Sequence, residues 1–303
     1  MEILEPKRNL FPKINLESKG EISLNKILNG RDAFVPYDLM TRGMQRSKIA
    51  RGVLYREDKD AFGRTIFTKV NENTVVLGGA IAALERLSGV ESSFHPNTLN
   101  DILNINPGYA YNFLNTPIAL FGCGNGGAGL DFGNVYAPDV KQNNISGLLP
   151  MMVSQTSPVG SDADKYAMKS TISTPDGTQL NCWYLKEFDT EPVIRSLWKD
   201  AASEDEDGTE ITADISDSES ENGVESFVQF KLVLNDDDVR SYYEAMGMLS
   251  QARFNSVGLY LGEKNDVLGD YVNVSLMSVV NINNEALAER KTITYYYRLY
   301  TMI

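Results

Sequence analysis

The chain has 303 residues, of which 42% are hydrophobic and 23% charged, proportions ordinary for a soluble globular protein. No run approaches the roughly 18–20 apolar residues that a membrane-spanning helix needs. A single histidine, His95, disfavours a histidine-rich metal site and most histidine-based acid–base enzymes. The first residues lack the features of a signal peptide, so we expect a protein made in the cytosol, with free thiols at Cys123 and Cys182.

The net charge of −13 is unevenly distributed along the chain. Residues 1–70 contain 14 Lys/Arg and 9 Asp/Glu, whereas residues 71–303 contain 14 Lys/Arg and 32 Asp/Glu. The basic residues either solvate the N-terminal segment or form a binding arm. The acidic remainder would repel nucleic acid, so no specific nucleic-acid binding is expected.

Residues 1–70 form the first of three predicted regions, an extended basic arm with a short strand at 64–70. A cluster of five positive charges lies within it, at Arg42, Arg46, Lys48, Arg51 and Arg56.

Residues 71–165 form the second region, which begins with a predicted helix at 73–88. Asn73 or Thr74 would cap its first turn. Apolar residues recur at helical spacing, namely Leu77, Ala80, Ile81, Leu84 and Leu87. Gly78 and Gly79 each cost about 1 kcal/mol of helix propensity, which is understandable if another backbone packs closely there. Gly89 is the expected stop.

The rest of the second region, residues 95–165, is rich in asparagine and glycine and weakly patterned. We interpret His95 as a loop residue before Pro96. Gly122, Gly124 and Gly127 match G-x-G-x-x-G after a short possible strand at 118–121, but no good helix start follows, which argues against a dinucleotide site. Such a long loop region suits a protein whose loops are ordered by neighbouring subunits.

Residues 166–303 form the third region, predicted as an antiparallel β-rich domain. Strands at 166–172 and 180–185 flank a Pro-Asp-Gly turn. The stretch 200–225 contains 11 acidic residues and no Lys or Arg, and we interpret it as a solvated loop. Its loose match to a calcium loop lacks the first aspartate and the final glutamate, so no cofactor or metal is expected.

The end of the chain reads strand, helix, strand, strand, strand. Alternating apolar residues predict strands at 228–234, 254–262, 272–282 and 291–303, with a helix at 236–252 packed on them. The last strand runs to the final residue, so we expect it to be built into a sheet. The expected fold class is α+β and β-dominated, with a sandwich-like antiparallel C-terminal module and an extended N-terminal arm.

Four tyrosines in the last predicted strand are the candidate functional residues, Tyr295, Tyr296, Tyr297 and Tyr300. Strand propensity and core packing explain them most simply. A subunit interface is the functional alternative, because tyrosine is enriched at interfaces. A platform for stacking sugars or bases is a third interpretation.

The segments 254–262, 272–282 and 293–300, with 73–80 upstream, resemble virion structural proteins of tailed bacteriophages. The resemblance covers about a third of the chain and carries no catalytic residues. It implies a non-enzymatic virion component, such as a neck or collar protein at the head–tail junction, that forms a ring with itself and contacts other virion proteins. A tail, baseplate or capsid-associated protein is an alternative place on the particle.

Two other classes of function remain open from the sequence. One is a carboxylate-dependent hydrolase of polysaccharide or cell wall, although no segment singles out its acid pair. The other is a carbohydrate- or receptor-binding β-sandwich. The structural protein is the preferred hypothesis.

Overall fold

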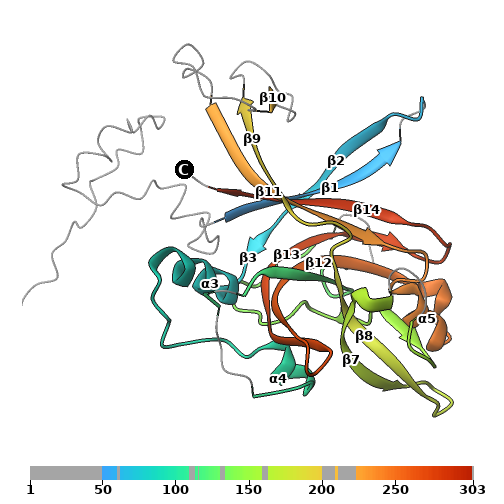
Figure 1. The fold of residues 1–303 in the computed structure, drawn as a ribbon. Helices are drawn as coiled ribbons and strands as arrows, with labels where there is room; N and C mark the ends of the chain where they lie inside the picture. The colour runs from blue at the N-terminus through green and yellow to red at the C-terminus, as the bar shows by residue number, and fades with distance from the viewer. Residues whose placement is uncertain are drawn as a thin grey trace, which may run out of the picture. The chain divides into compact units, whose positions relative to one another are not determined.

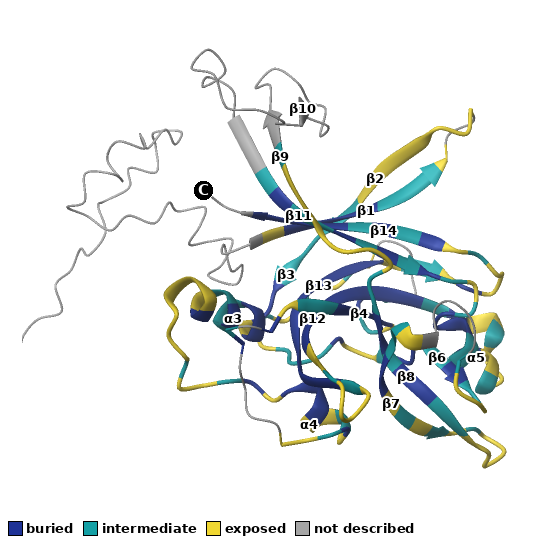
Figure 2. Cartoon of the chain, viewed as in Figure 1, coloured by how far each residue is buried: buried dark blue, intermediate teal, exposed yellow. Residues whose placement is uncertain are grey.

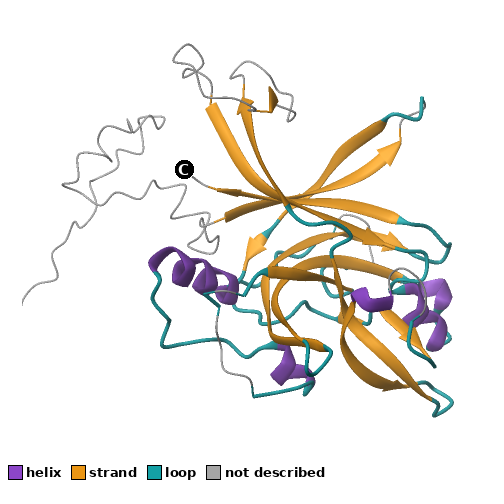
Figure 3. Ribbon diagram, viewed as in Figure 1, coloured by secondary structure: helices purple, strands orange, loops and turns teal. Residues whose placement is uncertain are grey.

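The structure is a computed structural model that describes residues 50–59, 62–108, 113–114, 116–129, 134–158, 163–199, 209–210 and 223–301. Strands dominate these residues, with a few short helices (Figure 1, Figure 3). The predicted β-dominated character is therefore confirmed. The predicted basic arm before residue 50 and most of the acidic loop 200–225 lie outside the described residues.

The strands form two antiparallel sheets, which we name sheet A and sheet B. The order in sheet A is β10 (Thr209–Glu210), β9 (Val193–Lys199), β11 (Gly223–Leu234), β14 (Ile293–Thr301), β1 (Ala50–Lys59) and β2 (Thr65–Glu72). The order in sheet B is β3 (Thr74–Val75), β13 (Asp270–Ala286), β12 (Arg253–Asn265), β4 (Ile118–Gly124), β8 (Gln179–Glu187) and β6 (Met152–Ser154). Two further strands flank sheet B, since β5 (Leu148–Leu149) pairs with β4 and β7 (Tyr166–Ser173) pairs with β8.

The last strand, β14, is a central strand of sheet A. It pairs with β1 on one side and with β11 on the other, both antiparallel. The expectation that this segment is built into a sheet is confirmed. The other strands of the C-terminal module divide between the sheets, because β12 and β13 belong to sheet B. Each sheet also contains strands from before residue 166.

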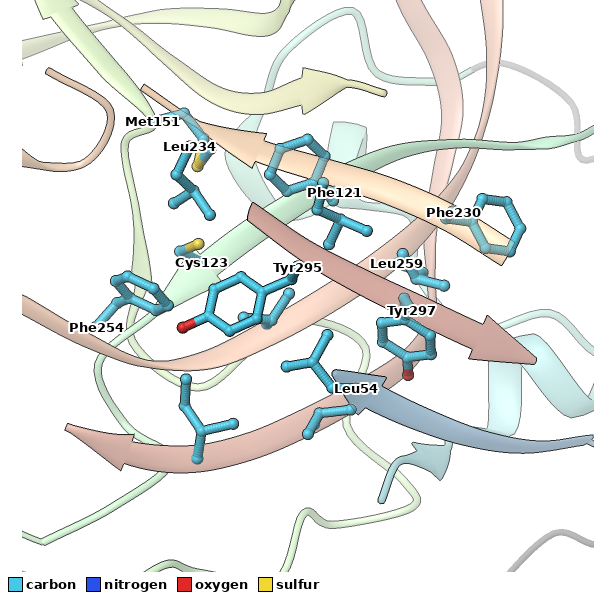
Figure 4. Close-up of a cluster of buried hydrophobic side chains, with 14 of the residues drawn as sticks. Leu54, Phe121, Cys123, Met151, Phe230, Leu234, Phe254, Leu259, Tyr295 and Tyr297 are labelled. Carbon is cyan, nitrogen blue, oxygen red and sulfur yellow. The ribbon is translucent and has the colours of Figure 1, made fainter. Parts of the chain in front are cut away.

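The largest buried cluster draws side chains from both sheets. Sheet A supplies residues such as Leu54, Phe230 and Tyr295, and sheet B supplies residues such as Phe121 and Phe254 (Figure 4). Side chains alternate between the faces of a strand, so every second residue of β14 enters this cluster. Burying one such large apolar side chain contributes about 1.5–3 kcal/mol.

Helix α3 (Leu77–Ser88) begins later than expected and buries a different face. No side chain caps it at Val76. Asn73 instead accepts a hydrogen bond from the Gly52 amide at 2.6 Å, so the predicted cap is wrong. The helix buries Gly78, Gly79, Ala82 and Glu85, while its leucines Leu77, Leu84 and Leu87 are exposed.

Gly78 and Gly79 explain why the helix buries this face and exposes its leucines. A Cβ at Gly79 would lie 2.1 Å from the Met277 carbonyl oxygen, so the helix approaches the β13 backbone as closely as two glycines allow. The expected close backbone contact is confirmed, and so is the stop at Gly89, which adopts a left-handed conformation with φ of 68°.

The described part of the glycine-dense segment is held by hydrogen bonds within its own chain. Residues 118–124 form β4. The Asn255 side chain on β12 accepts from the Gly127 amide at 2.7 Å and donates to the carbonyls of Asn125 and Ala128. The Asn284 side chain on β13 donates to the Gly129 carbonyl at 2.8 Å. Asparagine side chains thus replace strand pairing where the loop lies on the sheet.

The helix expected at 236–252 is shorter. It consists of α5 (Arg240–Ala245), a turn, and the 3₁₀ helix η3 (Leu249–Gln251). Gly247 ends α5 in a left-handed conformation with φ of 68°. Tyr243 and Ala252 nevertheless join the main buried cluster, so this segment does pack on the sheets.

Six strands were not foreseen, namely β1, β9 and the short strands β3, β5, β6 and β10. The described part of 95–165 also contains the short helix α4 (Leu99–Leu103). The β7–β8 pair and its turn are confirmed, with Gly177 at φ of 88° and its amide donating to the Thr174 carbonyl at 2.9 Å.

Candidate interface on the outer face of sheet A

Strand β14 distributes its four tyrosines over two faces. Tyr295 and Tyr297 are 1% and 0% exposed and lie in the protein's own core (Figure 4). Tyr297 shares a hydrogen bond of 2.8 Å with the Ser278 hydroxyl on sheet B, and burial raises the pKa of its phenol. Tyr296 and Tyr300 point to the opposite face. The four candidates therefore do not form one surface.

The opposite face, which we call the outer face, carries a small aromatic cluster with an arginine. Its members are Val53 and Tyr55 of β1, Phe227 of β11, and Tyr296, Arg298 and Tyr300 of β14. The strand register brings them together, because Tyr55 lies opposite Tyr296, Val53 opposite Arg298 and Phe227 opposite Tyr300. The rings of Phe227 and Tyr300 are 5.1 Å apart, and the hydroxyls of Tyr55 and Tyr300 are 3.3 Å apart.

Arg298 lies at the centre of this cluster and is 7% exposed. The carbon atom of its guanidinium is 4.6 Å from the Tyr55 ring centroid and 4.9 Å from that of Phe227. Its Nε donates to the Gln229 side chain at 3.0 Å. No carboxylate of the described residues forms an ion pair with it. Aromatic faces attract a cation and the guanidinium is weakly hydrated, so these two rings compensate part of its desolvation.

The cluster continues toward the β2 edge of the sheet. The Phe67 ring, with the side chain 42% exposed, meets the Tyr296 ring edge-on at 5.1 Å. The Arg51 guanidinium lies 6.0 Å from the Tyr300 centroid and pairs with Glu72 at 2.9 Å. Desolvation raises the pKa of Glu72, but the hydrogen bonds and charges of Arg51 and Lys69 outweigh it and lower this pKa below its usual value. The rim is therefore polar and charged, while the centre is aromatic.

This arrangement has the composition of a protein–protein contact. Tyrosine and arginine are enriched at interfaces and at their energetic hot spots. The centre of the cluster is buried, since Tyr55, Arg298 and Tyr300 are at most 7% exposed. The part open to a partner is therefore the half-buried Tyr296 and the exposed Phe67.

Sequence reasoning found Tyr296 and Tyr300 but missed Tyr55, Phe227 and Arg298. The period-2 alternation within β14 would have grouped Tyr296, Arg298 and Tyr300 on one face. Nothing local connects them to Tyr55 or Phe227, because those contacts follow from the pairing of strands far apart in the chain.

His95 is more than a loop residue, since it is bonded to helix α3. Its Nε2 lies 2.7 Å from the Glu85 carboxylate, which is 3% exposed, and its ring meets the Phe113 ring at 5.3 Å. Glu85 also accepts from the Ser92 amide at 2.7 Å. These contacts bind the loop after α3 to the helix.

The two cysteines are both free and buried. Burial raises the pKa of the Cys123 thiol, which lies in the main buried cluster. Among the described residues no group of three or more His, Cys, Asp or Glu could hold a metal ion. Over the same residues, no helix combines the length and apolar character that a membrane crossing requires.

The fold defines a β-dominated protein of two antiparallel sheets, with an aromatic–arginine cluster on the outer face of sheet A. Comparison with protein-family models, with curated proteins and with solved structures finds no match for the chain.

Proposed function

We propose that this protein is a non-enzymatic structural component of a tailed-phage virion, a neck or collar protein at the head–tail junction that forms a homo-oligomeric ring. In this proposal the two sheets pack as a sandwich, and the protein contacts itself and other virion proteins. It would be made in the host cytoplasm and incorporated into the particle.

The outer face of sheet A is the observation that supports an assembly role. It presents Arg298 between two aromatic rings, with Tyr296 and the half-exposed Phe67 beside it. Phe67 and Tyr296 are the aromatic groups there that a partner could cover, and aromatic residues are enriched at interfaces. The phage context rests on the resemblance of the C-terminal segments.

Imaging of the purified protein by electron microscopy, with its mass measured in solution, tests this proposal. We expect ring-shaped particles of one defined mass, and we expect the protein among the components of purified phage particles. A protein that stays monomeric at high concentration would contradict the proposal.

A pocket beside β7 and β8 favours a second candidate, the carbohydrate-binding protein. It has a volume of about 520 Å³ and polar walls that include Asn106, Thr171 and Asp270. However, its tryptophan, Trp183, is only 6% exposed and has the Lys169 ammonium 5.6 Å from its ring centroid. Sugars stack on open aromatic faces, so we favour the assembly role. Glycan-array binding that Trp183→Ala abolishes would reverse this preference.

A further inference from the structure

A lysine and an aspartate meet inside the protein, away from water. Strand β8 is mostly buried in its second half, as the dark blue colour shows (Figure 2). It carries Lys186, whose Nζ lies 2.7 Å from Oδ2 of Asp238, with side chains 3% and 0% exposed. The strand register places Lys186 opposite Phe121 of β4 on one side and Tyr166 of β7 on the other. The amine therefore approaches the carboxyl group beside aromatic side chains of the core.

Each oxygen of the Asp238 carboxylate has its own hydrogen-bond donors. Oδ1 accepts from the Tyr166 hydroxyl at 2.6 Å. Oδ2 accepts from the Asn235 backbone amide at 2.8 Å, as well as from Lys186. The Nζ of Lys186 also donates to the Val233 carbonyl at 3.2 Å. The carboxyl group is thus held with one oxygen on the tyrosine and the other on the amine.

The backbone after Asp238 is strained. Val239 has φ of 61° and ψ of −36°, a region in which a β-branched residue is an outlier. The Arg240 amide donates to the Asp238 carbonyl at 2.6 Å, so these residues form a tight turn centred on Val239. The burial of Val239 and the hydrogen bond from its amide to the Met151 carbonyl hold this conformation. Such strain persists where the surrounding structure over-determines it, and it is frequent at functional sites.

Proton transfer within the hydrogen bond converts the ion pair into an amine and a carboxylic acid. Burial disfavours the charged form of both groups, and desolvation raises the pKa of Asp238 although the charge of Lys186 opposes this. A desolvated, neutral lysine amine is a nucleophile. Because Oδ2 is bonded to Cγ, the Nζ lies close to the separation of about 3–3.5 Å from Cγ at which such reactions start.

We propose that Lys186 and Asp238 form an intramolecular isopeptide bond between Nζ and Cγ. The lone pair of Nζ forms the new bond, and the C=O electron pair moves onto Oδ1, where the Tyr166 hydroxyl stabilises the charge. A proton passes from Nζ to the Oδ2 hydroxyl, the Cγ–Oδ2 bond breaks, and Oδ2 leaves as water while the carbonyl re-forms at Oδ1. The reaction releases one water molecule and consumes no other reactant.

The amide retains two hydrogen-bond partners of the ion pair. Its carbonyl oxygen is the atom that Tyr166 already contacts, and its N–H donates to the Val233 carbonyl in place of the ammonium. The bond joins positions 52 apart in the sequence and links β8 of sheet B to the segment after β11 of sheet A. A covalent tie between the sheets resists unfolding. It forms within one chain, so its absence would leave the proposed function standing.

Mass spectrometry of the intact protein under denaturing conditions tests the bond. We expect the wild type to be lighter than its sequence mass by one water molecule. Lys186→Arg keeps the positive charge but has no amine that can form this amide, so it should have the full sequence mass. Lys264→Arg, at the exposed pair with Glu187, is the control and should keep the deficit. A wild type of full sequence mass would overturn the proposal.

Peptide mapping separates the bond from another loss of water. Asp176 precedes Gly177 and can close a succinimide, which gives the same mass but stays within one peptide. A digest of the wild type should instead contain a branched peptide that joins Lys186 to Asp238, and a digest without it would contradict the proposal. Tyr166→Phe should lower the joined fraction, because it removes the donor to Oδ1. If Lys186→Arg misfolds, Lys186→Met/Asp238→Asn removes the amine and leaves no buried charge.

Discussion

A buried ion pair shows how strongly single residues can affect the free energy of unfolding of this protein. Lys186 and Asp238 form an ion pair of 2.7 Å with side chains 3% and 0% exposed. The Asp238 carboxylate also accepts hydrogen bonds from the Tyr166 hydroxyl at 2.6 Å and from the Asn235 backbone amide at 2.8 Å. Lys186 also donates to the Val233 carbonyl. Desolvation nevertheless raises the pKa of Asp238 against the charge of Lys186. The pair therefore tolerates the loss of neither partner.

Replacing Lys186 with methionine should destabilise the protein strongly. The substitution leaves the Asp238 carboxylate buried without its counter-charge, which costs about 3–5 kcal/mol in the free energy of unfolding. Urea denaturation measures the loss. Lys264→Met is the matched control, because Lys264 pairs with Glu187 at 2.9 Å but is 53% exposed, and such pairs contribute about 0–1 kcal/mol. The double variant Lys186→Met/Asp238→Asn should recover part of the loss. An equal effect of both lysine substitutions would contradict this account.

Strand β14 shows how one element serves two purposes. Its period-2 alternation places Tyr295 and Tyr297 in the core and Tyr296 and Tyr300 on the outer face. Adjacent tyrosines in the sequence thus have different environments, and a substitution at each should report on a different property.

Alanine substitutions at Tyr295 and Tyr296 should separate stability from assembly. Tyr295→Ala removes a ring that is 1% exposed and meets Phe254 at 6.3 Å, so we expect a loss of about 3–5 kcal/mol in the free energy of unfolding. Tyr296→Ala should cost much less in stability and should weaken association between copies. Thermal unfolding and sedimentation measure the two effects. Similar stability losses at both positions would show that the outer face belongs to the core.

Helix α4 depends on a capping box for its start. The Thr98 hydroxyl accepts from the Asp101 amide at 3.1 Å and donates to the Asp101 carboxylate at 2.6 Å. That hydrogen bond is the main reason why the pKa of Asp101 falls below its usual value of 3.8. The same contacts replace hydrogen bonds that the first turn of a helix leaves unmade.

The capping box should give a pH-dependent part of the stability. Because folding lowers the pKa of Asp101, its contribution is fully present above its unfolded pKa and is lost as the pH falls through the folded pKa. The difference in unfolding temperature between wild type and Asp101→Asn should therefore shrink from about pH 7 to about pH 3. Thr98→Ala should cost about 1 kcal/mol and flatten the same pH profile. A difference that grows at low pH would contradict the assignment.

At the scale of the whole molecule, the position of a strand in its sheet determines how well its backbone amides are protected from exchange with solvent. Strand β14 is hydrogen-bonded to neighbours on both sides, whereas β2 has a neighbour on one side only. Amides of central strands exchange with solvent only in large opening events, whereas edge amides exchange by local opening.

Hydrogen exchange should follow this difference. We expect amides of β14 to exchange slowest. Amides of β2 should exchange faster, because this strand has a paired neighbour on one side only. Mass spectrometry of peptides from these strands measures the rates. Equal exchange rates in β2 and β14 would contradict this account.

The sequence by itself determined the local features of this protein. Alternating apolar residues predicted β2, β7, β8, β11, β12, β13 and β14, and the Pro-Asp-Gly turn predicted the β7–β8 connection, because side-chain period and turn geometry depend on neighbouring residues. The close approach at Gly79 was also readable, since two glycines within a helix have few other uses.

Only the tertiary structure decided which faces are buried and which strands meet. The leucines of α3 are exposed because Gly78 and Gly79 lie against β13, nearly 200 positions later in the sequence. Arg298 lies between Tyr55 and Phe227 because β14 pairs with both β1 and β11. Such pairings depend on how the whole chain packs, and a local sequence pattern does not specify them.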